Sequence, residues 1–518
     1  MSLKSEIYGL LYNGKRLCAD CAEAGELLKS LREMEQRLEQ PLRVAVVGMM
    51  KAGKSTFMNA LMGADILYTG NLETTYTVGW FRYGEQPFLT ICFRNGETMD
   101  APFEELQKWS VREYEKENPG IHDVKYLIIH YPSEVLKQLE FIDTPGLNSV
   151  YGTDAENTLD FLSIKGSEET VYEASAADAV IYAFSKSAAG FDREILQAFH
   201  SGGAGASPIN SVGILTKVDA TGIWDIFSAA TPVEAAKPVA DTVMQHPDMK
   251  NLLFAVFPVC AKVMEGYAKL TARDWEALYS VARTDEDTLA DLLFDAEQFA
   301  VCGEAEFEKL APTPRRKRLM GMLGQYGILE IAKLIRAGKK PDEIETILKE
   351  ACGIQAVRDI LLSHFGNRVF LIKSRYIFTH LWALTHQLMH DPESSADLRN
   401  ICEQIREEID GIMSSVQTLK ELKILQMYYN GQVEFFSEEE KEDFLCVTGE
   451  YGRSAEARLG MKEGCTVRQL ARRAREKVDF WHERASGFML PGTYVEAAAT
   501  LARSYEQMYL HLSALSEE

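Results

Sequence analysis

The chain has 518 residues, of which 46% are hydrophobic, so its length predicts a soluble protein of two to four domains with packed cores. A formal charge of −22 argues against nucleic acid, or a strongly anionic membrane, as a broad electrostatic partner, because both repel an acidic surface. No apolar run reaches the roughly 18 to 20 residues of a bilayer span. The first residues lack a signal-peptide core, so we expect a cytoplasmic protein.

The N-terminal segment 1–40 reads as helical. Leu27, Leu31, Met34 and Leu38 recur at intervals of four, three and four residues, which is the seam of a helix that packs lengthwise on another helix. A partner seam is therefore expected elsewhere in the chain.

A phosphate-binding loop follows directly after the apolar run that starts at Leu42. It reads Gly48-Met49-Met50-Lys51-Ala52-Gly53-Lys54-Ser55, and the nucleotide contacts are expected to continue to Thr56. Glycines let the backbone amides surround phosphates, and the N-terminus of the following helix faces the same negative charge. Lys54 is expected to reach the β and γ phosphates, and the Ser55 hydroxyl to hold Mg²⁺.

The next interval contains more strands than a minimal nucleotide-binding domain needs. Three segments are rich in β-branched and aromatic residues, at 77–83, 89–93 and 124–130. They predict an enlarged central sheet.

A second motif expected to face the phosphates is Asp143-Thr-Pro-Gly146, which ends the apolar run Leu139-Glu-Phe-Ile. Asp143 is expected to bind Mg²⁺ through water, and the Gly146 amide to contact the γ phosphate. Taken singly, the segment also fits a simple turn.

A guanine signature follows in Val212-Gly-Ile-Leu-Thr216-Lys217-Val-Asp219. Asp219 would accept hydrogen bonds from guanine N1 and the exocyclic amine, and would be left unpaired by adenine. Lys217 would lie along the plane of the base.

The last motif is Phe257-Pro-Val-Cys260-Ala261-Lys262, which is similar to the SAK loop whose backbone amide contacts guanine O6. Cys260 replaces the usual serine, a mild change because the amide makes the contact. The order of all four motifs, each after a strand-like run, predicts a GTP site.

These motifs and the enlarged sheet resemble the dynamin superfamily. The resemblance is sharpest in Gly53-Lys-Ser-Thr-Phe-Met-Asn-Ala-Leu-Met-Gly63 and Leu72-Glu-Thr-Thr-Tyr-Thr77, which look like the phosphate-loop helix and first switch of bacterial dynamin-like proteins. It implies that a switch threonine, Thr75 with Thr74 as the alternative, closes over Mg²⁺ and holds the attacking water. It also implies GTP hydrolysis to GDP and phosphate.

Lys51 is the candidate for stabilising charge in the transition state. The residue after Gly146 is Leu147, which cannot orient water as a glutamine would. In dynamins this role belongs partly to a polar residue of the phosphate loop, beside a serine that recruits a monovalent cation; in this chain the two positions hold Met50 and Lys51, so the Lys51 ammonium would replace either an arginine finger or that cation. Lys51 occupies the position of the internal arginine finger of guanylate-binding proteins, although a solvated loop lysine is the alternative.

After Lys262 the sequence is helical almost throughout. Residues 351–366 look like the terminal helix of this family's GTPase domain, which makes 264–350 a helical insertion and 41–372 the GTPase domain. Seams in 377–388 and 405–419 match the N-terminal one, and one long helix is expected over 395–430. The predicted fold is α/β plus all-α, with a bundle, or trunk, built from residues 1–40 and 373–518.

The resemblance implies that GTP hydrolysis is coupled to association through GTPase domains and to trunk movement, for membrane remodelling or tethering. The implied partners are a second copy, membrane lipid on the inner face of the cell membrane, or a second dynamin-like protein. Phe488, Met489 and Leu490 form a candidate loop for membrane or partner contact, and burial against the bundle is the alternative. The other function is a soluble GTP-dependent switch whose bundle binds a partner protein without lipid.

Overall fold

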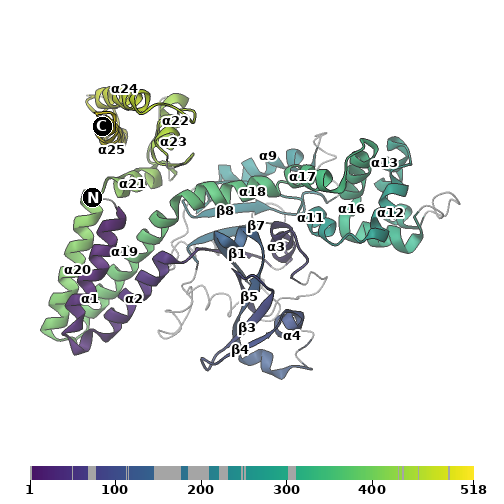
Figure 1. Ribbon diagram of the computed structural model, residues 1–518, viewed down its shortest axis with the longest axis horizontal. Coiled ribbons are helices and arrows are strands. Elements are labelled where there is room, and N and C mark those ends of the chain that lie inside the picture. Colours follow the sequence, from purple (N-terminus) through teal and green to yellow (C-terminus); the bar gives the residue numbers. More distant parts are fainter. Residues whose placement is uncertain are drawn as a thin grey trace.

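The computed structural model describes residues 3–49, 51–67, 77–111, 114, 116–144, 177–184, 209–220, 231–246, 249, 252–301, 311–429, 431–434, 437–452, 454–487 and 490–517. A central β-sheet lies between a helical insertion on one side and a helical bundle on the other (Figure 1).

Nine strands of the described residues form one mixed sheet in the order β4-β3-β5-β2-β6-β1-β7-β8-β9. Strands β6, β1, β7, β8 and β9 are mutually parallel, β2 runs antiparallel to β6, and the β3–β4 hairpin extends the sheet beyond β5. The carboxyl ends of the five parallel strands therefore meet at one edge, where open α/β sheets bind ligands. The strands are β1 (Leu42–Gly48), β2 (Val78–Tyr83), β3 (Phe88–Phe93), β4 (Thr98–Pro102), β5 (Val124–Tyr131), β6 (Leu139–Asp143), β7 (Ala179–Phe184), β8 (Ser211–Leu215) and β9 (Val256–Pro258).

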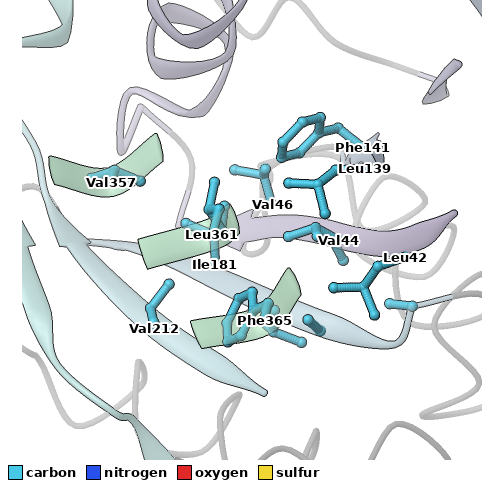
Figure 2. Close-up of a cluster of buried hydrophobic side chains, with 14 of the residues drawn as sticks. Leu42, Val44, Val46, Leu139, Phe141, Ile181, Val212, Val357, Leu361 and Phe365 are labelled. Carbon is cyan, nitrogen blue, oxygen red and sulfur yellow. The ribbon is translucent and has the colours of Figure 1, made fainter. Parts of the chain in front are cut away.

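One face of the central strands is covered by the helical segment that begins with α18 (Ile354–Ile360) and continues through a π-helical turn at Leu361–Phe365. Alternate residues of β1 point to this face, and helix residues four apart meet them. Figure 2 shows these fully buried side chains in contact across the layers. They are Leu42, Val44, Val46, Leu139, Phe141, Ile181, Val212, Val357, Leu361 and Phe365.

The other helices near the sheet belong to the nucleotide-binding half and to the insertion. The first group is α3 (Lys54–Met62), α4 (Leu106–Ser110), α9 (Pro232–Gln245) and α11 (Ala261–Ala268). The insertion continues with α12 (Ala272–Val281), α13 (Glu286–Phe294), α14 (Ala296–Val301), α16 (Thr313–Arg336) and α17 (Pro341–Ala351). Figure 1 shows α12, α13 and α16 far from the bundle, at the opposite end of the molecule.

The bundle combines the N-terminal segment with residues 366–415, so the N-terminal helices pack on later ones as the sequence predicts, but the expected trunk of 373–518 stops at Ser415. It contains α1 (Leu3–Ala19), α2 (Gly25–Glu39), α19 (Gly366–His390) and α20 (Ala396–Ser415) (Figure 1). Gly14 of α1 allows close packing, because a Cβ there would lie 3.0 Å from Leu31 and 3.5 Å from Ile405. The predicted fold, a nucleotide-binding domain with an enlarged mixed sheet joined to such a bundle, is thereby confirmed.

A continuous helical path joins the two parts. It runs from α18 through the π-helical turn into α19, so the expected domain boundary near residue 372 falls inside a helix. At its side, the buried guanidinium of Arg37 donates two hydrogen bonds to Asp178 Oδ1, at 3.0 and 2.7 Å. Lys373 of α19 donates to the carbonyl of Arg37 at 2.7 Å and to that of Gln40, at the end of α2. These contacts fix the bundle to the base of the sheet.

The single long helix expected over 395–430 is wrong. Helix α20 ends at Ser415, Val416 has an extended backbone (φ −81, ψ 116), and α21 begins at Gln417. Residues 417–517 form a separate C-terminal lobe, drawn above the bundle in Figure 1. Its helices are α21 (Gln417–Tyr429), α22 (Glu438–Val447), α23 (Ala455–Arg458), α24 (Val467–Ala485) and α25 (Gly492–Glu517).

The C-terminal lobe is attached to the π-helical turn by a buried ionic cluster. Glu450 of the lobe lies 2.8 Å from His364 Nδ1 and 2.6 Å from Arg368 Nη2. Tyr429 donates to the same carboxylate at 3.2 Å, and Phe254 stacks on His364 with ring centroids 4.0 Å apart. Helix α19, the π-helical turn and the lobe therefore meet at one carboxylate, and Phe254, on the approach to β9, packs against the His364 ring beside it.

Within the residues described, no helix has both the length and the apolar character needed to cross a membrane.

Candidate functional site

The phosphate loop connects β1 to α3 in a backbone conformation that most residues avoid. Gly48 has φ 150 and Gly53 has φ 87, and a Cβ on Gly48 would lie 2.5 Å from the carbonyl oxygen of Ala183. In the described part of the chain, the non-glycine residues with positive φ are Lys51 (φ 59) and Lys217 (φ 60). Both belong to predicted nucleotide motifs, and such backbone strain clusters at functional sites.

Lys54 and Asp143 are both buried beneath the phosphate loop, and each affects the pKa of the other. Lys54 donates hydrogen bonds to the carbonyls of Gly48 at 3.2 Å and Met49 at 3.4 Å. Burial lowers the pKa of Lys54 to about 8, although the Asp143 carboxylate opposes this change. Burial also raises the pKa of Asp143 to about 7, against the lowering effects of Lys54 and of the Ser55 hydroxyl.

Asp143 and Ser55 suit a magnesium ion. Both Asp143 carboxylate oxygens are buried and lack a hydrogen bond of good geometry, and the Ser55 side chain lies beside them. The described residues contain no cluster of three or more His, Cys, Asp or Glu arranged for a metal. Mg²⁺ commonly takes one or two protein ligands and completes its shell with phosphate and water.

The guanine motif after β8 contacts the phosphate loop directly. Thr216 Oγ1 lies 2.5 Å from the carbonyl oxygen of Ala52 and 2.9 Å from that of Phe184. Asp219 stands at the open edge beyond it. Burial raises the pKa of Asp219, and the positive charges of Lys262 and Lys217 oppose that rise.

The loop after β9 enters α11 at the same edge. Cys260 precedes the helix, is fully buried, and donates its backbone N–H to the carbonyl of Cys352 at 2.9 Å. The amides of Ala261 and Lys262 are in the first turn of α11, where a helix supplies no acceptor of its own. These two amides are therefore the candidates for contact with O6.

The predicted residues that the structure describes thus gather at one edge of the sheet. Lys51 is exposed on the crest of the phosphate loop, and Met49, Ser55 and Thr56 are partly buried. Leu490 lies apart from them, next to Gly487 before α25. Met50, Thr74, Thr75, Gly146, Phe488 and Met489 lie outside the described residues.

Sequence reasoning missed three residues at this edge. Thr144 donates its hydroxyl to the carbonyl of Val46 at 2.9 Å and so ties β6 to β1. Cys352 and Gly353 contact the loop after β9 from a segment about 90 residues away in sequence. A glycine beside a predicted helix start can mark an unusual backbone conformation, so Gly353 was the signal in the sequence that could have pointed to this contact.

Comparison with known proteins agrees with this geometry. The pattern of the Dynamin family matches residues 44–204. The isoniazid-induced protein IniC of Mycobacterium tuberculosis is 26% identical over 504 residues, which cover 95% of this chain and 94% of that protein. The bacterial dynamin-like protein of Nostoc punctiforme is 35% identical over 126 residues, or 23% of this chain and 18% of that protein.

Dynamin-like protein 2 of Campylobacter jejuni is 30% identical over 136 residues, covering 26% of this chain and 21% of that protein. The residues that match the family pattern, 44–204, include the phosphate loop and the strands around it. Residues 44–204 therefore match the Dynamin family, whose members are GTPases, and the chain as a whole resembles bacterial dynamin-like proteins.

Proposed function

We propose that the chain binds GTP with Mg²⁺ and hydrolyses GTP to GDP and phosphate. The observation that carries this proposal is the meeting of the phosphate loop and the guanine motif, where Thr216 contacts Ala52. A triphosphate in the loop would place its purine beside Asp219, because both motifs follow neighbouring parts of one parallel sheet.

Phosphate binding falls to the loop backbone and to Lys54. The turn formed by Gly48 and Gly53 exposes amides, and α3 directs its positive N-terminus at the same point. Lys54, now held by two loop carbonyls, would exchange them for the β and γ phosphate oxygens.

Ser55 and Asp143, with Thr75 of the first switch, are the residues proposed to hold Mg²⁺. When held there, Mg²⁺ would supply positive charge against the phosphate oxygens during transfer of the γ phosphoryl group. Asp143 is suited to this position, because a nearby cation would favour the ionised carboxylate that burial disfavours.

Base selectivity is assigned to Asp219 and to the first amides of α11. Asp219 accepts from guanine N1 and the exocyclic amine, and the Ala261 amide donates to O6. Adenine offers neither match, so two buried polar groups would be left unpaired.

Lys51 is proposed to stabilise charge near the β,γ bridging oxygen during hydrolysis. Its exposed side chain and left-handed backbone place it on the crest of the loop. Lys51→Ala should lower kcat by about 100-fold and change the dissociation constant of GDP by less than about threefold, since the contact forms in the transition state. Steady-state turnover and GDP titration measure the two effects.

The left-handed backbone at Lys51 supplies a matched control. Lys51→Gly removes the same side chain but relieves the backbone, so it should lose as much turnover as Lys51→Ala. If the glycine variant turns over GTP normally, the loss of turnover in Lys51→Ala comes from backbone strain, and the proposed charge role is refuted.

We further propose that hydrolysis is coupled to association of GTPase domains and to movement of the bundle, for membrane remodelling or tethering. The continuous helix from α18 into α19 supports coupling, because it begins at the guanine loop and ends in the bundle.

GTP turnover should rise more steeply than protein concentration, and liposomes should increase it. A linear rise would refute the association step. If liposomes leave GTP turnover unchanged and the chain forms a GTP-dependent one-to-one complex with another protein, the alternative function is favoured, which is a switch that does not contact lipid.

A further inference from the structure

The loop that precedes α11 is clamped from one side by Cys352 and Gly353. The carbonyl of Cys352 accepts the N–H of Cys260 at 2.9 Å, and burial together with the neighbouring Cys352 thiol raises the pKa of the buried Cys260 thiol. Gly353 has φ 74, and a Cβ there would lie 2.4 Å from the carbonyl oxygen of Pro258. Only glycine combines this backbone conformation with so close an approach.

The same loop and α11 rest on α16 from the other side. A Cβ on Gly266 would lie 2.3 Å from the carbonyl oxygen of Met322, so α11 touches the backbone of α16. Gly324 interrupts α16 with φ 69 and ψ −179, and Lys262 Nζ lies 4.0 Å from the position of its Cβ. The helical insertion therefore begins at the guanine loop, passes beneath it at α16, and returns to it at Cys352.

A backbone amide can recognise guanine O6 only where the main chain places it. No side-chain rotamer can correct a displaced amide, and a shift of about 1 Å is enough to weaken such a contact severely. The position of residues 258–261 must therefore be set by whatever packs on their backbone.

We infer that Cys352 and Gly353 are the positioning element of the guanine-reading loop, and that the helical insertion serves base recognition by bringing them to it. The inference rests on the proposed GTP site and assigns a role there to residues outside every nucleotide motif. Neither residue touches the nucleotide in this account, because both act through Pro258 and Cys260.

Gly353→Ala tests the inference. The added methyl group must displace the carbonyl of Pro258, so the dissociation constant of GDP should rise about tenfold or more through loss of the O6 contact. At saturating GTP, kcat should stay within about threefold of wild type, because base contacts are equal in the ground and transition states. The dissociation constant of IDP, which keeps O6 but lacks the exocyclic amine, should rise by the same factor as that of GDP.

Gly338→Ala is the matched control. Gly338 also has a left-handed backbone, with φ 76, and lies in the insertion, but no atom lies within 4 Å of its Cβ position. It carries similar backbone strain without touching the loop, so its GDP affinity should stay within about twofold of wild type. Equal effects of the two variants on GDP affinity would overturn the inference.

A second variant tests the inference in the event that Gly353→Ala does not fold. Cys352→Ala removes the thiol that meets Cys260 and should raise the GDP dissociation constant about threefold with kcat unchanged. Wild-type affinity in this variant would overturn the inference while leaving the proposed function intact. Absence of GDP binding by the wild-type chain would instead refute the proposed function itself.

Discussion

Lys54→Ala is expected to abolish measurable GTP hydrolysis and to raise the dissociation constant of GDP by about 100-fold, the scale of one or two charge-assisted hydrogen bonds to phosphate. Lys54 is buried, and two loop carbonyls aim its ammonium group at the centre of the phosphate loop. Its pKa of about 8 still leaves most of the population protonated near neutral pH. A fluorescent GDP analogue titrated into the variant measures the loss.

The fold should survive this substitution, because Asp143, the charge left behind, can take up a proton. Its pKa is already raised to about 7 by burial, and loss of the ammonium raises it further. Lys137→Ala, at an exposed lysine paired with Glu134, is the surface control and should bind GDP normally. GDP affinity of Lys54→Ala within threefold of wild type, with normal circular dichroism, would contradict the assignment of Lys54 to phosphate.

Glu450→Gln is expected to release the C-terminal lobe from the π-helical turn. The Glu450 carboxylate is the shared partner of His364 and Arg368, and Arg368 is almost completely buried. A neutral amide leaves that guanidinium without its counter-charge, and breaking a buried ion pair costs about 3 to 5 kcal/mol. Small-angle scattering should show a larger radius of gyration, and urea unfolding should show lower stability.

Glu421→Gln is the matched control for this release. Glu421 pairs with Arg458 at 2.7 Å inside the same lobe, and it is as buried as Glu450. The control should lose some stability without expanding. A radius of gyration in Glu450→Gln equal to that of wild type would show that the lobe is held by other contacts.

The pH dependence of this ionic cluster has a definite sign. Burial alone would raise the pKa of Glu450, but His364 and Arg368 lower it to about 2. Its stabilising contribution is therefore complete above the unfolded value of about 4.5 and disappears as pH falls toward 2. The stability difference between wild type and Glu450→Gln should be constant from pH 7 to about 4.5 and shrink below it.

Most strands around the nucleotide motifs could be predicted, because each is a buried apolar run that ends at a motif. The three additional segments at 77–83, 89–93 and 124–130 also match β2, β3 and β5 within a residue or two. Strand β4 was missed, since Thr98–Pro102 is mostly exposed, contains a proline and shows no apolar alternation. Strand β7 was also missed, although its six buried residues are typical of a central parallel strand.

The break at Val416 could not be read from the hydrophobic pattern. Ile412, Val416 and Leu419 are all buried, so the seam continues across the break although the helix does not. Likewise, no local pattern pairs Glu450 with His364 or Gly353 with Pro258. These contacts depend on how the helical path packs on the sheet, and separations of 86 and 95 residues leave no periodic signal.

Calorimetric titration with GDP tests the central claim, a guanine-nucleotide site, most directly. The wild-type chain with Mg²⁺ should release heat on binding GDP and bind XDP at least about 100-fold more weakly. Asp219→Asn should reverse this preference, because the amide donates to the xanthine oxygen and no longer accepts from the guanine amine. Absence of binding heat from GDP with the wild-type chain, or unchanged GDP preference in Asp219→Asn, would contradict the account.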